Sequence, residues 1–85
     1  MTESRDIRIK RMKMRAMRRG IKEMDLILST YADRNLTLMD PEGLDRFDAL
    51  LHENDQDLYQ WVTGQALPPA PFADLISDIA QTFQK

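Results

Sequence analysis

Apolar residues recur at spacings of three and four along most of this 85-residue chain, and residues that end helices separate the repeats. Such spacing places the apolar side chains on one face of an α-helix, whereas a half-buried strand would show strict alternation. The breaks fall at Gly20, Asn35, Pro41, Gly64 and the proline-rich link 67–71. The pattern therefore predicts an all-α protein, a small bundle of four to five short helices that forms a single helical domain over residues 1–85.

Capping residues locate the expected helices more closely. Asp40 followed by Pro41 predicts a helix start, and so does Asn54 or Asp55. The expected helices run from residue 5 to 19, from 21 to 34, from the Asp40 start, from 54 or 55 to Gly64, and from 72 to 83. Residues 36–39 are expected to form a packed loop. The expected common core comprises Ile27, Leu28, Phe47, Leu51, Trp61, Ile76 and Ile79.

The composition argues against an enzyme. A chain of 85 residues buries only about 60% of its unfolded surface, which leaves little room for a deep catalytic cleft. It contains no cysteine and one histidine, His52, which we expect to be structural and to lie at the margin of the core. The acidic run 53–57 lacks the pattern of a calcium loop and is interpreted as a helix cap. No apolar run suits a membrane span or a signal peptide, so we expect a soluble protein inside the cell.

Charge is divided unevenly along the chain. Residues 1–22 carry nine basic and two acidic residues, whereas the remainder carries three basic and twelve acidic residues. Within the first part a basic stripe recurs at helical spacing, and it comprises Arg8, Arg11, Arg15 and Arg18. The stripe can be a solvated helix face, a surface for an anionic partner or a nucleic-acid contact. An arginine-rich transit peptide is disfavoured because Glu3 and Asp6 interrupt it.

The basic helix meets the acidic body in the stretch RRGIKEMD, residues 18–25. Gly20 is interpreted as the helix stop, because the residue after a last turn often needs a positive φ that glycine reaches cheaply. Glu23 then falls in the first turn of the next helix, where a carboxylate meets free N–H groups. We therefore expect Arg19, Gly20 and Glu23 to lie close together at a helix–helix corner. The spacing does not decide between a plain corner and a recognition site.

The same stretch resembles the Arg-Gly-x-x-Glu motif of the succinate dehydrogenase assembly factor family, the small flavinylation factors called SdhE in bacteria. Residues 55–64, with the sequence DQDLYQWVTG, resemble the second motif of that family, Asp-x-Asp-Leu-x-x-Trp ending in Gly. The resemblance covers about residues 8–64. The chain departs from the family mainly before Arg18, where it is rich in methionine and more basic than some relatives.

The resemblance implies an assembly factor or chaperone that is not an enzyme. It implies binding to the flavoprotein subunit of succinate dehydrogenase, with fumarate reductase as a second candidate, and promotion of covalent FAD attachment. The FAD belongs to the partner, so no stably bound cofactor, no metal and no catalytic residue is expected in this chain. We also expect a monomer. The expected location is the bacterial cytoplasm, and the mitochondrial matrix is less favoured.

The residues expected to bind the partner are Arg18, Arg19, Gly20, Glu23 and Asp25, to which the basic stripe adds Arg11 and Arg15. The family motif implies that Arg19 donates hydrogen bonds to the partner near its flavin site. It also implies that Gly20 lets two backbones approach and that Glu23 orients Arg19 or the helix start. The alternative hypothesis is a small nucleic-acid- or ribosome-associated protein that uses the basic helix.

Overall fold

The computed structural model describes residues 4–83 of the chain. Over these residues it contains five α-helices, two short 3-10 helices and no strand, which confirms the predicted all-α class. In chain order the elements are α1 (Arg5–Ala16), α2 (Lys22–Asn35), η1 (Leu36–Leu38), α3 (Pro41–Leu51), α4 (Asp55–Thr63), η2 (Ala70–Phe72) and α5 (Ala73–Phe83).

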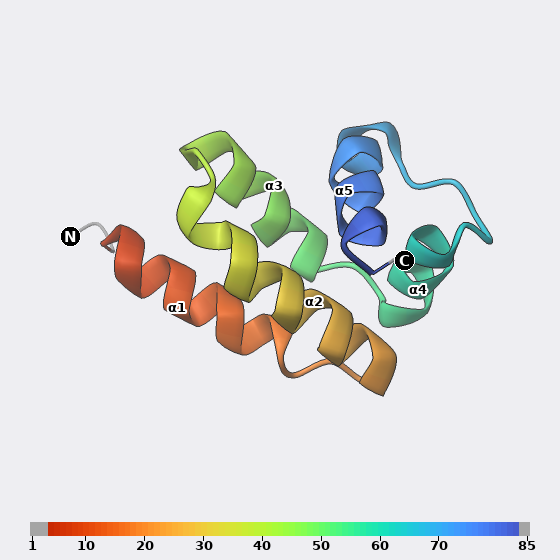
Figure 1. The fold of residues 1–85 in the computed structure, drawn as a ribbon, viewed down its shortest axis with the longest axis horizontal. Coiled ribbons are helices and arrows are strands. Elements are labelled where there is room, and N and C mark those ends of the chain that lie inside the picture. Colours follow the sequence, from red (N-terminus) through yellow and green to blue (C-terminus); the bar gives the residue numbers. More distant parts are fainter. Residues whose placement is uncertain (1–3, 84–85) are drawn as a thin grey trace.

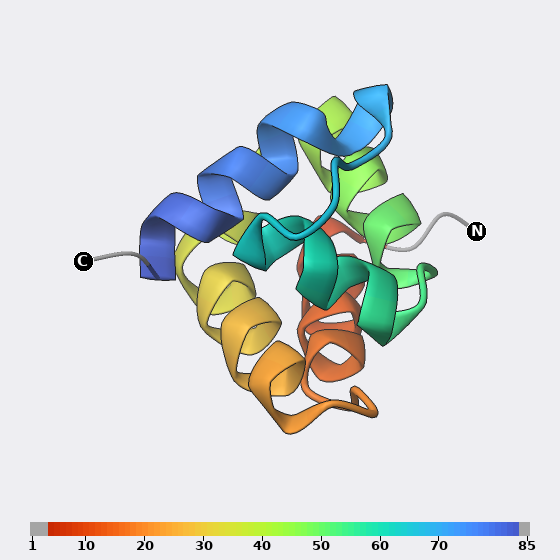
Figure 2. The ribbon, with the colours of Figure 1, turned by 90° about the vertical axis from the view of Figure 1, so that its right-hand side faces the viewer.

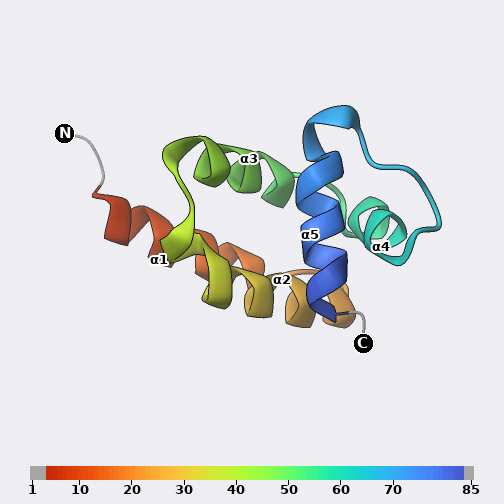
Figure 3. The same cartoon turned by 45° about the horizontal axis from the view of Figure 1, so that its top comes forward.

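The antiparallel pair of α1 and α2 forms the base of the fold (Figure 1). The other three α-helices cover one side of this pair, and α5 crosses over α2 with α4 beside it (Figure 2). Figure 3 shows α3 and α5 on the same side of the pair. The arrangement brings the α3–α4 connection close to the α1–α2 connection, and these two connections build the site described below.

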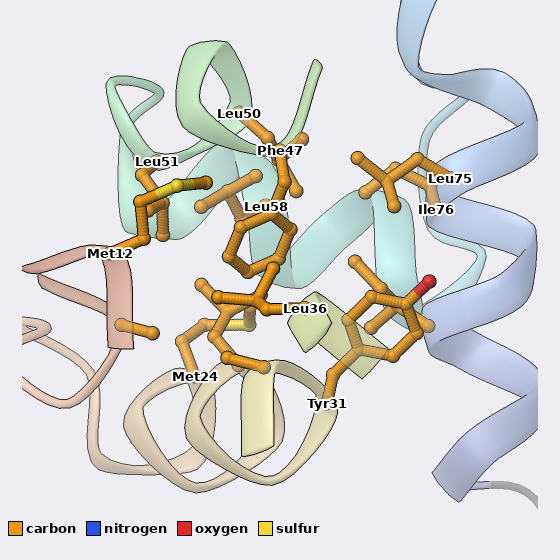
Figure 4. Packing of buried hydrophobic residues seen from close by; sticks show 14 of the residues in the cluster. Met12, Met24, Tyr31, Leu36, Phe47, Leu50, Leu51, Leu58, Leu75 and Ile76 are labelled. Atoms are coloured by element: carbon orange, nitrogen blue, oxygen red, sulfur yellow. The ribbon is translucent and has the colours of Figure 1, made fainter. Parts of the chain in front are cut away.

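Side chains from all five α-helices meet in one hydrophobic core (Figure 4). Met24, Leu28 and Phe47 have no exposed surface, and the ring of Phe47 stacks on that of Tyr31 with 5.9 Å between centroids. Full burial of one such side chain contributes about 1.5–3 kcal/mol, so this core is the main source of stability. The structure confirms the core residues Leu28, Phe47, Leu51, Ile76 and Ile79.

Two residues of the expected core lie at its edge. Ile27 and Trp61 are only partly buried, because Met24, Leu28 and Tyr31 form the inward face of α2 and Leu58 and Val62 form that of α4. Trp61 packs instead against Phe72, with 6.3 Å between ring centroids. The expectation of a central Trp61 is therefore corrected. The side chain of Phe83, which the helical pattern also placed inward, lies outside the described part of the structure.

The predicted caps are present. The carboxylate of Asp40 accepts a hydrogen bond from the N–H of Gly43 at 2.8 Å, and the side chain of Asn54 accepts one from Gln56 at 2.8 Å. Gly64 ends α4 in the left-handed region with a φ of 84°. These bonds satisfy backbone groups that the helix ends would otherwise leave unpaired.

Two boundaries differ from the expectation. Helix α1 ends at Ala16 and not at residue 19, because the N–H of Met17 is shared between the carbonyls of Lys13 and Met14 and tightens the last turn. The segment 36–39 is not a plain loop, since most of it forms η1 with Leu36 fully buried. The residues between α1 and α2 therefore form a true loop, residues 17–21.

Candidate functional site

Arg19 and Asp55 form a largely buried ion pair that joins the loop 17–21 to the start of α4. Nε of Arg19 donates to Oδ1 of Asp55 at 2.6 Å, and the two side chains are only 10% and 14% exposed. The terminal nitrogens of Arg19 donate to the carbonyl oxygens of Leu51 at 2.7 Å and Glu53 at 2.8 Å. Leu51 is the last residue of α3, where helices leave carbonyl groups unpaired. The guanidinium of Arg19 therefore serves contacts inside the chain.

Asp55 also holds the start of α2. Its Oδ2 accepts hydrogen bonds from the backbone N–H groups of Gly20 and Ile21, the latter at 3.2 Å. Ile21 is the N-cap of α2 and has no side-chain cap of its own, so Asp55 supplies the negative charge that a helix start favours. Asp55 is at the same time the first residue of α4. The carboxylate of Asp55 thus neutralises Arg19, accepts hydrogen bonds at the start of α2 and places a negative charge in the first turn of α4.

Gly20 leaves room for this carboxylate. A Cβ at Gly20 would lie 3.2 Å from Oδ2 of Asp55, which is tighter than ordinary van der Waals contact. The φ of Gly20 is not positive, and the only positive-φ residue among those described is Gly64. The prediction that Gly20 is a positive-φ helix stop is therefore wrong. The structure ties this glycine to the close approach of Asp55.

Glu23 lies in the first turn of α2, as predicted, but among the described residues no hydrogen bond or ion pair joins it to Arg19. Glu23 is exposed, while Arg19 turns to Asp55. Arg18 is also exposed and Asp25 is half-buried. Arg18, Glu23 and Asp25 are thus accessible at the surface, and their contacts with a partner stay predictions.

Acidic residues of α3 partly neutralise the basic stripe of α1. Nη2 of Arg8 donates to Oδ1 of Asp45 at 2.6 Å and lies 3.6 Å from Oδ2 of Asp48. The hydrogen bond to Asp45 is the main reason why the pKa of Arg8 is raised. Arg15 forms an ion pair with Asp48 as well. A nucleic acid that approached this stripe would meet the carboxylates with the arginines, which disfavours the nucleic-acid alternative.

Two surface hollows are lined, the first by residues of α1 and the loop 17–21 and the second by residues of α2. The first has a volume of about 420 Å³ and is lined by Arg11, Met14, Arg15, Arg18 and Arg19. The second has a volume of about 580 Å³ and is lined by Lys22, Glu23, Asp25, Leu26 and Ser29. Together they include every residue expected to bind a partner except Gly20. Each hollow joins charged groups to an exposed apolar side chain, 43% exposed for Met14 and 64% for Leu26, a combination suited to protein recognition.

The described residues offer no metal centre. Within residues 4–83 no group of three or more His, Cys, Asp and Glu side chains could hold a metal ion. His52 is 73% exposed and its Nε2 lies 4.0 Å from Oδ1 of Asp48, so its side chain lies at the surface and its structural role stays a prediction. Over the same residues no helix has both the length and the apolar character needed to cross a membrane.

Comparison with known families shows to which family this chain belongs. The family described as flavinator of succinate dehydrogenase matches residues 10–83, which include the loop 17–21, Asp55 and every core residue except Ile9. The chain belongs to this family. This match confirms the resemblance inferred from the two sequence motifs, and residues of both motifs meet in this chain at the Arg19–Asp55 pair.

Individual relatives are named as assembly factors of succinate dehydrogenase. Proteins named succinate dehydrogenase assembly factor 2, mitochondrial, are 48% identical in Candida glabrata over 72% of this chain and 38% identical in Kluyveromyces lactis over 98% of it. The protein of that name in Meyerozyma guilliermondii is 36% identical over 98% of this chain. The match covers 40%, 52% and 62% of these three relatives, so the chain spans roughly half of their length.

The relatives overturn the expected location. The expectation was a protein of the bacterial cytoplasm, with the mitochondrial matrix less favoured. The relatives compared above are fungal proteins that are named as mitochondrial. The expectation of a bacterial cytoplasmic location is therefore corrected.

Sequence reasoning missed Asp55 as the partner of Arg19. It assigned residues 53–57 to a helix cap and treated the two family motifs as separate landmarks. One signal was available, because the first motif contributes an arginine beside a glycine and the second begins with an aspartate. The sequence gives no reason to choose Asp55 over the neighbouring Asp57, which the structure leaves exposed.

Proposed function

We propose that this chain binds the flavoprotein subunit of succinate dehydrogenase as a monomer and promotes covalent attachment of FAD to it. The flavoprotein of fumarate reductase is a second partner in this proposal. Membership of the flavinator family supports the assembly role. The names of the mitochondrial relatives support succinate dehydrogenase as the enzyme assembled.

The chain contributes a surface and not a reacting group in this proposal. A histidine of the partner bonds to the flavin, and the bound chain keeps the mobile parts of the partner in a geometry where that bond can form. Holding two groups in place needs shape and charge complementarity, which a domain of 85 residues can supply without a deep cleft. The FAD stays with the partner throughout.

The observation that carries the proposal is that residues of the family's first motif line two hollows that mix charge with apolar surface. Arg18 in the loop and Glu23 in the first turn of α2 are exposed, and Leu26 presents an exposed side chain one turn further along α2. Arginine and apolar groups are common at the centres of protein interfaces. The basic lining of the first hollow suits an acidic segment of the partner, so we expect association to slow as salt rises.

Loss and restoration of covalent flavin test this function. Cells that lack their own factor are supplied with the wild-type chain, with Arg18→Glu or with Glu23→Lys, and covalent flavin on the flavoprotein is measured by in-gel fluorescence after denaturation. We expect the wild type to restore the signal. We expect each surface variant to lower it severalfold, because charge reversal opposes the partner surface without disturbing the core.

Arg46→Glu on α3 is the matched control, since Arg46 is exposed and lies in neither of the two hollows. It makes the same charge change as Arg18→Glu and should leave flavin attachment normal. Fluorescence that persists with no factor at all, or that the wild type fails to restore, would overturn the proposed function. Normal fluorescence with both surface variants would leave the assembly role intact and move the binding surface elsewhere.

A further inference from the structure

The second half of the loop 17–21 depends on one distant side chain. The N–H groups of Met17 and Arg18 bond to carbonyls of α1, so the first half of the loop continues from that helix. The N–H groups of Gly20 and Ile21 both bond to the carboxylate of Asp55, which lies on another helix. The position where α2 begins is thus set from outside the α1–α2 hairpin.

Asp55 binds this loop strongly because it accepts hydrogen bonds both from the loop backbone and from the side chain of Arg19. Asp55 takes the two N–H groups with Oδ2 and the Arg19 guanidinium with Oδ1, and Arg19 continues to two carbonyls near the end of α3. Hydrogen bonds between charged groups are stronger than neutral ones, and this set is largely shielded from water. The contacts leave the loop a single arrangement, and Gly20 permits it because no Cβ pushes the carboxylate away.

We propose that Asp55 is a positioning residue for partner recognition: it holds Arg19, Gly20 and Ile21, the N-cap of α2, so that the residues on either side face the flavoprotein. This inference rests on the proposed function. Arg18 precedes the held segment and Glu23 follows it, and both are exposed. The role of Arg19 then lies in fixing the loop, and the partner reads the neighbouring exposed side chains. The aspartate of the second family motif and the arginine and glycine of the first act as one unit.

The test compares Asp55→Asn with Asp57→Asn. Both variants remove one negative charge from the first turn of α4, but only Asp55 contacts the loop, whereas Asp57 is exposed. An asparagine at position 55 keeps the size of the side chain and turns an N–H group toward donors that need an acceptor. Binding of the purified flavoprotein is measured by calorimetry. We expect Asp55→Asn to weaken binding about tenfold or more and Asp57→Asn to change it less than about twofold.

Nuclear magnetic resonance supplies a readout that overall stability does not move. In the wild type the Nε–H of Arg19 and the N–H of Gly20 should exchange slowly with water, since both bond to Asp55. Asp55→Asn should speed exchange at these two groups while the core amides keep their protection. Gly64→Ala serves as a destabilised control at the opposite end of α4, because a positive φ costs alanine about 1 kcal/mol and leaves the loop untouched.

A variant that unfolds does not end the test. Gly20→Ala keeps every charge and displaces the carboxylate by its Cβ alone, so it should speed exchange at the Nε–H of Arg19 and weaken binding in parallel. Equal binding by the wild type and a folded Asp55→Asn would overturn the positioning role, and so would equal losses in Asp55→Asn and Gly64→Ala. A wild type that does not bind the flavoprotein would instead refute the proposed function, which the calorimetry shows before any variant is compared.

Discussion

The hydroxyl of Tyr31 donates a hydrogen bond to the carboxylate of Asp78, which ties the middle of α2 to α5. Tyr31 is only 2% exposed, and its ring also packs on Phe47. Burial, together with the hydrogen bond and the negative charge of Asp78, raises the pKa of Tyr31 well above its ordinary value. The folded state therefore resists ionisation of this phenol.

This pKa direction predicts loss of stability at alkaline pH. Because the folded pKa is raised, the stabilisation is fully present below the unfolded pKa of about 10 and is lost as pH rises above it. Urea unfolding followed from neutral pH upward should show this decline. Tyr31→Phe should cost about 1 kcal/mol at neutral pH and make the alkaline decline shallower. Tyr59→Phe, at a half-buried position, is the control; a slope that survives Tyr31→Phe unchanged would assign the decline to other groups.

We expect Arg19→Ala to lower the free energy of unfolding by about 3 kcal/mol, because it leaves the carboxylate of Asp55 largely buried without its cation. The neighbouring exposed Arg18→Ala should change it by less than about 0.5 kcal/mol. Chemical denaturation of both variants measures the difference. A cycle with Asp55→Ala should give a coupling energy of at least about 1 kcal/mol, and additive losses would mean that the ion pair contributes little.

Truncation to alanine should have different effects on stability at Phe47 and at Trp61. Phe47 is fully buried, so Phe47→Ala should cost about 3–5 kcal/mol and unfold much of a domain this small. Trp61 is only partly buried against Phe72, so Trp61→Ala should cost clearly less, about 1–2 kcal/mol by the apolar area it covers. Thermal unfolding followed by circular dichroism separates the two cases. Equal losses of stability in the two variants would mean that Trp61 contributes to the core as much as Phe47 does.

Removing the acids that face the basic stripe should expose it to polyanions. We expect the double variant Asp45→Asn with Asp48→Asn to bind duplex DNA more tightly than the wild type, since Arg8 and Arg15 lose their intramolecular partners. Each arginine freed to contact a phosphate should steepen the dependence of log affinity on log salt by about 0.9. Fluorescence anisotropy over a salt series measures this slope.

The control for that experiment makes the same change in net charge elsewhere. Asp57→Asn with Asp74→Asn removes two exposed carboxylates that do not pair with α1. If the control raises DNA affinity as much as the first pair does, net charge and not local masking accounts for the gain in affinity.

The sequence by itself determined the helices and most of the core of this protein. Spacings of three and four and residues such as Asp40, Asn54 and Gly64 act within one or two turns, so neighbouring residues contain the whole signal. The same locality explains why Leu28 and Phe47 were placed correctly. It also explains the error at Trp61, because periodicity shows which face of a helix turns toward the core but not how far the residues at the edge of that face are buried.

Only the tertiary structure decided the roles of Arg19, Gly20 and Asp55. The sequence contains fourteen acidic residues, and nothing local to Arg19 selects the one that lies 36 positions later. That choice requires α4 to begin beside the loop 17–21, which follows from the packing of α4 and α5 on α2. The same packing brings the carboxylate of Asp55 against Gly20. The sequence suggested that Gly20 ends a helix, but in the structure this glycine leaves space for the distant side chain of Asp55.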